Sequence, residues 1–372
     1  MPQRYAMKFL IGITKYGANA INNLLLFKMN KGGEMKAAVY KSKQSLVVEE
    51  IPTPEPGPDE IQIKISHSAI CGTDVHVYLY DIAPPNTVLG HEFAGEVSKI
   101  GSNVTRFKLG DRVIGMGGTP PPGKESPLRK QEQFNYRLEG ITNSRTRGYA
   151  EYTVCNEWEP LKLPDNVSNL EGALAEPCAV VTRAVRLSQQ KLGDTVAVLG
   201  AGPIGLLCLQ AAKAAGANKV IVSEPSKARR AIALELGADA VVDPTAQDPV
   251  ESIIELTDGH GPHVVYECAA AKPSLQNALD MVRKKGNVML VALAWEDVPL
   301  LPVDWAGKEI QLNTTFGSEP YDFKVAVDLI AAKKFLLGPL LSETDTIQLK
   351  DIQKAFESLI KPSNQIQMVI KF

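Results

Sequence analysis

Three side chains with metal-binding chemistry occur close together in the first half of the chain. Cys71 begins the segment Cys71–His76, and His91 and Glu92 stand side by side a short way beyond it. A thiolate, an imidazole and a carboxylate form a borderline-soft donor set that suits zinc with one open position. Taken singly, they could be a buried thiol, a turn histidine and a surface charge. Taken together, they predict a zinc site.

A second candidate site is the glycine pattern G-x-G-x-x-G at residues 200–205, which follows the apolar run 195–199. Residues 206–214 favour a helix, so a strand, a tight turn and a helix are expected here. The first glycine would permit the turn, the second would admit a pyrophosphate, and the third would let the helix pack on the strand. We therefore assign contacts with a dinucleotide to Gly200, Gly202, Pro203, Ile204 and Gly205.

A carboxylate at the end of the next predicted strand bears on which dinucleotide binds. Glu224 follows Lys219–Ser223, about 20 residues after the last glycine, where an acid accepts from the ribose 2′-hydroxyl. It would also repel a 2′-phosphate, so it favours NAD over NADP. Arg229 and Arg230 could meet a phosphate. With Glu224 present, we expect Arg229 to border the adenine or to lie on a solvated helix face.

Composition places these sites in an ordinary globular protein. The chain of 372 residues is longer than a single domain with one hydrophobic core usually is, so two domains are expected. The formal net charge of −2 shows no excess of positive charge of the kind that attracts nucleic acid or an anionic membrane. No apolar run approaches the ~20 residues of a membrane span. The five cysteines are scattered without a C-x-x-C pair, which predicts reduced thiols and a cytoplasmic protein.

Two kinds of elements must position these residues. From Met35 to about Gly115 the pattern is of short β-strands and turns, and residues 148–154 return to it. A helix near Leu170–Gln189 then leads into alternating strands and helices up to Val291, which predict a parallel sheet. After 316–318 we expect helices over Asp322–Ala332 and Leu349–Leu359 and a last strand over Gln365–Phe372.

The first 34 residues differ from the rest. They carry five basic residues but no acid before Glu34, and a transit peptide is one explanation. Residues 31–34 can also be encoded by a purine-rich stretch resembling a bacterial ribosome-binding site just before Met35. Our hypothesis is that residues 1–34 are a non-native or disordered extension and that Met35 is the native start.

The motifs MKAAVY, ICGTDVH, GHEFAGEV, GDRV, AEP and VLGAGPIG resemble, in order and spacing, the zinc-dependent medium-chain dehydrogenase/reductase family. The match covers nearly everything from Met35 to Phe372, and CGTDVHVY is most similar to the sorbitol, threonine and butanediol dehydrogenase branch. The resemblance implies an α/β fold: a Rossmann doubly wound parallel sheet inserted in a GroES-like β-rich catalytic domain. The corresponding domain bounds are 35–176, 177–316 and 317–372.

The resemblance also implies roles for individual residues. Cys71, His91 and Glu92 would hold the catalytic zinc, with Glu176 as a further ligand or acting through a water. Cys178 competes with Glu176, because liver-type alcohol dehydrogenases place a cysteine near here. Two residues that are two positions apart on a helix point in directions that differ by ~200°, so Glu176 and Cys178 could not both face one metal. Thr73 would pass the alcohol proton through the cofactor ribose to His76. Alternatively, Thr73 is a turn residue whose hydroxyl bonds to the backbone, and His76 is a partly exposed helix residue without a role in the reaction.

The implied reaction is NAD-dependent oxidation of a secondary alcohol, polyol or vicinal diol to a ketone, in a homotetramer or dimer. Residues 115–147 contain no cysteine, so the four-cysteine structural zinc of many members cannot form there. Three alternatives stay open: a threonine-type amino-alcohol dehydrogenase, a zinc-free quinone or enoyl reductase, and a non-catalytic nucleotide-binding relative. Threonine would need a cation near the zinc, and none of the motifs supplies one.

Overall fold

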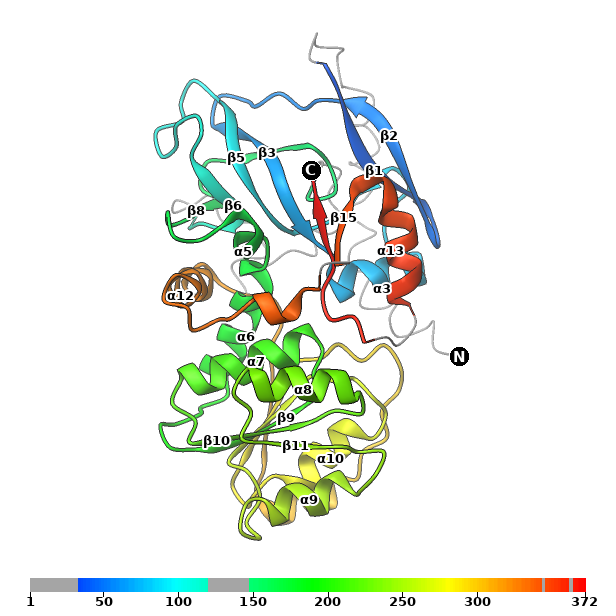
Figure 1. The fold of residues 1–372 in the computed structure, drawn as a ribbon, viewed down its shortest axis with the longest axis vertical. Helices are drawn as coiled ribbons and strands as arrows, with labels where there is room; N and C mark the ends of the chain where they lie inside the picture. Colours follow the sequence, from blue (N-terminus) through cyan, green and yellow to red (C-terminus); the bar gives the residue numbers. More distant parts are fainter. Residues whose placement is uncertain (1–32, 120–146, 343–344, 361–363) are drawn as a thin grey trace.

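The computed structural model describes residues 33–119, 147–342, 345–360 and 364–372. A β-rich lobe lies above an α/β lobe, with helices α5 (Asn169–Ala173) and α6 (Ala175–Leu187) between them (Figure 1). Most of residues 1–34, to which the hypothesis of an extension applies, and most of the cysteine-free segment 115–147 lie outside the described residues. No described helix is long and apolar enough to cross a membrane.

The β-rich lobe contains two sheets with mostly antiparallel pairing. The smaller sheet has the order β2-β1-β4, with strands Ser45–Pro52, Glu34–Ser42 and Thr87–Val88. The larger has the order β15-β16-β3-β5-β6-β8, and β7 also pairs with β3. Its strands are Thr346–Gln348, Val369–Lys371, Glu60–Ala69, Glu92–Ile100, Arg112–Gly117, Pro160–Lys162 and, for β7, Tyr152–Asn156. Residues far apart in sequence, including the C-terminal strand, thus complete one sheet.

The register of β3 and β5 brings the candidate metal ligands together. The alternating isoleucines of β3 are buried, which fixes which face of the strand meets the core. In that register Ala69, at the end of β3, is opposite Glu92, at the start of β5. Cys71 follows two residues after Ala69, so it lies beside His91 and Glu92.

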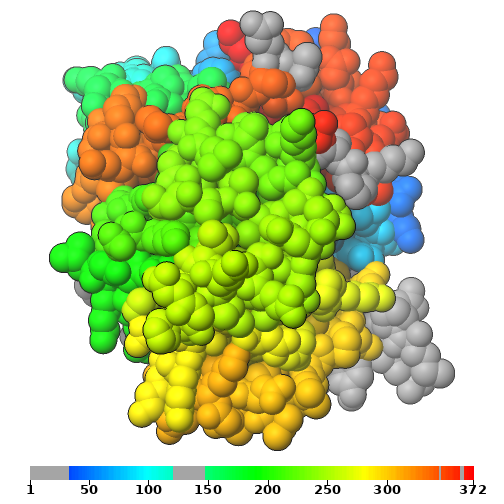
Figure 2. Space-filling model, turned by 60° about the horizontal axis from the view of Figure 1, so that its bottom comes forward, coloured from blue at the N-terminus to red at the C-terminus, as the bar shows by residue number. Residues whose placement is uncertain are grey.

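The α/β lobe is a six-stranded parallel sheet with the order β11-β10-β9-β12-β13-β14. The strands are Ala240–Val242, Lys219–Ser223, Thr195–Leu199, Val264–Glu267, Asn287–Leu290 and Gln311–Thr314. The helices are α7 (Pro203–Ala214), α8 (Lys227–Glu235), α9 (Pro249–Glu255), α10 (Ser274–Met281) and α11 (Val303–Lys308). This order is that of a doubly wound sheet, so a ligand is expected where β9 and β12 adjoin. When the view of Figure 1 is turned so that its bottom comes forward, residues of this lobe cover most of the near face (Figure 2).

Several elements differ from the sequence-based expectation. The single helix predicted near Leu170–Gln189 is two helices, α5 (Asn169–Ala173) and α6 (Ala175–Leu187), broken at Leu174. The capping box of Ser168 and Glu171 explains the start of α5. The last predicted strand is only Val369–Lys371, and strand β14 and helix α11 were not anticipated. Both of these are short and largely exposed, so they carry little apolar periodicity.

Two helices after β14 return the chain to the first lobe. Helix α12 (Pro320–Ala331) packs against α6, and α13 (Ile352–Leu359) continues the 3₁₀ turn Leu349–Asp351. Arg183 and Arg186 on α6 form ion pairs with Glu319 and Asp322 at the start of α12. Because Asp322 is fully buried, these pairs fix the position of α12 relative to α6.

Candidate functional site

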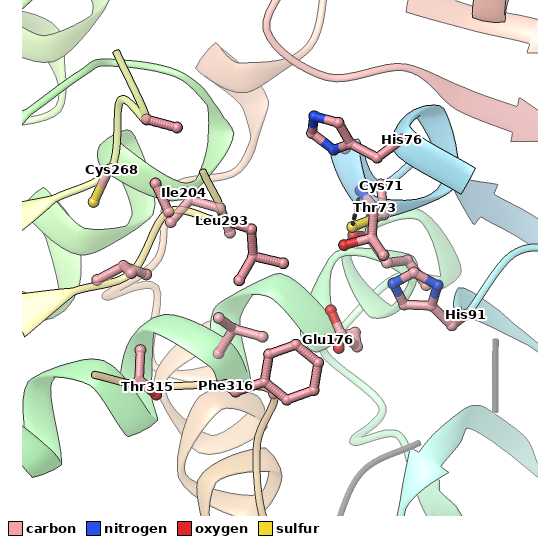
Figure 3. Close-up of a pocket in the computed structure, with 17 residues that line it drawn as sticks. Cys71, Thr73, His76, His91, Glu176, Ile204, Cys268, Leu293, Thr315 and Phe316 are labelled. Carbon is pink, nitrogen blue, oxygen red and sulfur yellow. Dashed lines mark hydrogen bonds between the residues drawn. The ribbon is translucent and has the colours of Figure 1, made fainter. Parts of the chain in front are cut away.

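One candidate metal centre lies where helix α3 (Gly72–Tyr80) meets strand β5. Cys71 is the N-cap of α3, and its Sγ accepts from the Thr73 backbone N–H at 3.4 Å. Ligand atoms of Cys71, His91 and Glu92 all lie within 4.8 Å of one another. Figure 3 shows Cys71, Thr73 and His91 on one side of a pocket, with Glu176 beside them. The three donors therefore could close around a single ion.

Neighbouring polar groups orient two of these donors. Asp74 Oδ2 lies 3.5 Å from His91 Nδ1, which leaves Nε2 of the ring for a metal. Gln367 Nε2 donates to Glu92 Oε2 at 3.4 Å and to the Ile70 carbonyl at 3.1 Å. Sequence reasoning gave no role to Gln367. No sequence signal marks Gln367, since only the pairing of β16 with β3 brings it here.

The electrostatics of the cluster fit a bound cation. Burial, together with Glu92, raises the pKa of the Cys71 thiol to about 11. Burial, together with Glu176, raises the pKa of Glu92 to about 8. Burial would lower the pKa of His91, but Asp74 and Cys71 outweigh it and raise that pKa well above its ordinary value. Buried acidic donors that repel one another are what a divalent ion would neutralise.

The structure separates the two competing residues on α6. Glu176 lines the same pocket as Cys71, His91 and Glu92. Cys178 is fully buried in the hydrophobic core and does not line the pocket, and burial raises the pKa of its thiol well above the ordinary value. Both residues are helical, as the argument from helix geometry requires. Of the two, Glu176 therefore has the geometry to reach a metal or a water there.

The pocket beside this cluster has a volume of about 280 Å³ and a mainly apolar far wall. That wall comes from helix α6 and the α/β lobe, namely Val180, Ile204, Cys268, Ala270, Val291, Ala292, Leu293, Thr315, Phe316 and Gly317. Phe316 and Leu293 were not expected from sequence as wall residues, because they follow strands rather than belong to a motif. The aromatic residues Tyr78, Tyr80, Trp158 and Trp295 do not line the pocket.

Thr73 and His76 are both on α3 and both line the pocket. The His76 ring stacks on Trp295 with centroids 5.0 Å apart, and Trp295 stacks in turn on Tyr80. Burial lowers the pKa of His76 below its ordinary value, so the ring is neutral near neutral pH. A neutral imidazole can accept a proton, so the position and charge state of His76 suit the relay inferred from the resemblance.

The glycine turn has the conformation that a dinucleotide site needs. Gly200 has φ +91°, a left-handed conformation that glycine adopts readily. A Cβ on Gly205 would lie only 1.8 Å from the Gly200 carbonyl oxygen, so helix α7 can approach β9 only without a side chain there. At Gly202 the space is open apart from Arg229 Nη1 at 4.0 Å. Pro203 and Ile204 begin α7, and Ile204 also faces the first pocket.

A second cavity of about 650 Å³ begins at this turn. It is lined by Gly200, Gly202, Ser223, Glu224, Ser226, Arg229 and Asn364, among others, and Cys268 lines both cavities, so the two adjoin. The Glu224 carboxylate accepts from the backbone N–H of Ala201 at 2.7 Å and of Ser226 at 2.9 Å. Its two oxygens are thereby held at the edge of the cavity.

The two arginines of α8 differ in where they point. Arg229 lines the second cavity and donates through Nη2 to the Gln365 carbonyl at 2.6 Å. Arg230 pairs with Asp243 at 2.7 Å and does not line the cavity. Arg229 therefore lies at the second cavity rather than on a fully solvated helix face, and Arg230 pairs with Asp243 instead.

Comparisons with known proteins agree with this geometry. Residues 57–165 match the model of the alcohol dehydrogenase GroES-like domain, and residues 203–332 match that of the zinc-binding dehydrogenases. A D-arabitol-phosphate dehydrogenase from Enterococcus avium is 32% identical over 351 residues, covering 92% of this chain and 98% of that protein. Human sorbitol dehydrogenase is 36% identical over 347 residues, covering 88% and 95%.

A solved structure supports the same relationship. A zinc-binding dehydrogenase from Sinorhizobium meliloti 1021, solved bound to NADP, superposes with a TM-score of 0.83 at 31% identity and covers 91% of this chain and 100% of its own. The fold and the site thus define an oxidoreductase that combines zinc with a nicotinamide cofactor. The chain belongs to the zinc-dependent medium-chain dehydrogenase/reductase family, as its sequence motifs predicted. It is an alcohol dehydrogenase in the broad sense, acting on a small molecule.

Proposed function

We propose that this protein oxidises a neutral secondary alcohol, polyol or vicinal diol to a ketone, with one zinc ion per chain and NAD as the hydride acceptor. The observation that carries the proposal is the meeting of two cavities at Cys268. One holds the donors Cys71, His91 and Glu92, and the other begins at the glycine turn. A substrate carbon beside the metal donors would therefore face the reactive end of a dinucleotide.

Each proposed site residue has a distinct task. Cys71, His91 and Glu92 would hold the zinc, with Glu176 acting directly or through a water. When bound, zinc supplies Lewis-acid polarisation of the alcohol oxygen, and NAD accepts the hydride. Thr73 would accept the alcohol proton and pass it through the cofactor ribose toward His76. The apolar wall, which includes Ile204, Leu293 and Phe316, would exclude water from the reacting carbon.

The charge of the pocket supports a neutral substrate. Among the described residues that line it, none is a lysine or arginine, while Glu92 and Glu176 are acidic. A carboxylate or phosphate group on the substrate would have no described cation to pair with. This favours a polyol or diol over threonine and over a phosphorylated polyol.

A substrate panel tests the proposed reaction. We expect purified protein to reduce NAD with at least one of sorbitol, xylitol, inositol and 2,3-butanediol, and much more slowly with threonine or arabitol phosphate. A chelator should remove the activity and added zinc should restore it. Protein that contains no zinc and is active without it would instead indicate a quinone or enoyl reductase. Zinc-loaded protein without turnover on any alcohol would favour the non-catalytic alternative.

The proton relay predicts a specific effect at Thr73. Replacing Thr73 by valine keeps the shape but removes the hydroxyl, so we expect kcat to fall about 10²-fold, within the usual range for a lost proton-transfer group. Thr73→Ser keeps the hydroxyl and should retain most of the activity. Steady-state kinetics at saturating substrate measure both, and equal activities of the valine and serine variants would exclude the relay.

Assembly, location and domain bounds are part of the same proposal. Strand β14 ends the parallel sheet, and Leu312 on it and the nearby Leu301 and Val303 are exposed. An exposed edge strand beside apolar side chains supports pairing with a second copy, so we propose a homodimer or homotetramer. Size-exclusion chromatography with light scattering tests this, and a monomer would contradict it.

We retain domain bounds of 35–176, 177–316 and 317–372, and a cytoplasmic location in view of the five free cysteines.

A further inference from the structure

Tyr149 is a buried tyrosine one step away from the proposed zinc ligands. Its side chain is fully buried, and its Oη donates to Asp74 Oδ2 at 2.7 Å. The same oxygen of Asp74 lies 3.5 Å from Nδ1 of His91. Phenol, carboxylate and imidazole therefore form a row inside the protein. Neither the sequence motifs nor the proposed reaction gives Tyr149 a task.

The phenol is held rigidly in this row. The Tyr149 backbone N–H donates to the Leu89 carbonyl at 3.0 Å, and its carbonyl accepts from the Ala38 N–H at 2.8 Å. The ring meets Phe356 edge to face, with centroids 6.0 Å apart. A Cβ on Gly90 would lie 2.7 Å from Tyr149 Cδ1, so the ring occupies the room left by the residue directly before His91. The position of the phenol is thus coupled to the backbone that carries the histidine.

Asp74 depends on this phenol as a hydrogen-bond partner. The carboxylate is fully buried, and its other oxygen, Oδ1, has no hydrogen-bond partner among the described residues. Burial and the nearby Asp74 raise the pKa of Tyr149 well above its ordinary value, so the phenol keeps its proton and donates. Without this donor, Asp74 would retain only its longer contact with His91, and a buried carboxylate left so poorly paired would move away from its present position.

We propose that Tyr149 is a positioning residue of the zinc site: its phenol fixes the Asp74 carboxylate, which orients His91 so that Nε2 faces Cys71 and Glu92. The inference rests on the proposed function, because it requires a metal at these donors. A carboxylate behind a metal-binding histidine sets the ring's tautomer and direction, and loss of such outer partners typically costs 10–100-fold in metal affinity. Tyr149 acts through Asp74, so its effect should fall at the lower end of that range.

The test compares zinc affinities of metal-free protein by competition with a chromophoric chelator. We expect Tyr149→Phe to raise the zinc Kd about 10-fold. Tyr40→Phe is the matched control, since Tyr40 is also fully buried in the same hydrophobic cluster and its phenol donates to another carboxylate, that of Asp81. Its zinc Kd should stay within about twofold of wild type.

A double-mutant cycle separates positioning from a general loss of packing. If Tyr149 acts through Asp74, Asp74→Asn combined with Tyr149→Phe should bind zinc no more weakly than Asp74→Asn alone. The absorption spectrum of cobalt-substituted protein should also change in Tyr149→Phe and not in Tyr40→Phe. A zinc Kd in Tyr149→Phe equal to that of wild type, or fully additive losses in the cycle, would overturn the positioning role alone. A wild-type protein that binds no zinc would overturn the proposed function itself.

Discussion

Replacing Cys71 by serine should remove bound zinc and lower kcat/KM by about three orders of magnitude. The donors Cys71, His91 and Glu92 lie within 4.8 Å of one another, so loss of the thiolate leaves a metal site with one soft ligand fewer. A bound metal contributes several kcal/mol of charge stabilisation in the transition state, and about 4 kcal/mol corresponds to a factor of about 10³. Elemental analysis gives the zinc content, and NADH formation with the best substrate of the panel gives the rate.

Cys178→Ser is the matched control for this prediction. Cys178 carries the same thiol, lies in the same part of the molecule on α6 and does not line the pocket. We expect this variant to keep its zinc and most of its activity, although the buried hydroxyl will lower the stability of the fold. If Cys178→Ser lost its zinc while Glu176→Gln kept it, the assignment of Glu176 rather than Cys178 would be wrong. A Cys71→Ser protein with full zinc and full turnover would refute the metal centre.

Replacing Glu224 by alanine should change the preference between NAD and NADP by about 10²- to 10³-fold. Its carboxylate is fixed by the N–H groups of Ala201 and Ser226 at the edge of the second cavity, the proposed cofactor site. A hydrogen bond from a ribose hydroxyl to a charged group is worth about 1.5–3 kcal/mol, which is about 10- to 10²-fold in affinity for NAD. Removing the negative charge also ends its repulsion of a 2′-phosphate, and Arg229 remains at the cavity to attract one.

The measurement is the ratio of kcat/KM for the two cofactors in wild type and variants. We expect wild type to prefer NAD, even though the Sinorhizobium meliloti relative was solved with NADP. Glu235→Ala is the control for a change of charge, because Glu235 is an exposed acid at the end of α8, the helix that follows Glu224, and does not line the cavity. If the ratio of kcat/KM for NAD and NADP were unchanged in Glu224→Ala, or changed equally in Glu235→Ala, Glu224 would not be the residue that distinguishes the two cofactors at the ribose.

The sequence alone predicted the chemistry of the two sites, because that chemistry depends on residue type within short segments. The glycine turn is readable since the backbone at Gly200 and the close contact at Gly205 each exclude a side chain. The motifs around Cys71 and His91 likewise predicted the family, the α/β fold and the parallel sheet, which the comparisons confirm. Element boundaries were less predictable, as the break at Leu174 and the unforeseen strand β14 show.

Only the tertiary structure decided what surrounds these motifs. The register that sets Ala69 opposite Glu92 depends on which face of β3 is buried, and sequence spacing does not contain that information. The contact of Gln367 with Glu92 and that of Tyr149 with Asp74 join residues 275 and 75 positions apart. Such partners are not marked by a local sequence pattern, because a hydrogen bond between distant segments does not constrain the residues next to either partner. The sequence therefore determined which groups can bind and react, whereas long-range packing decided which groups hold them in place.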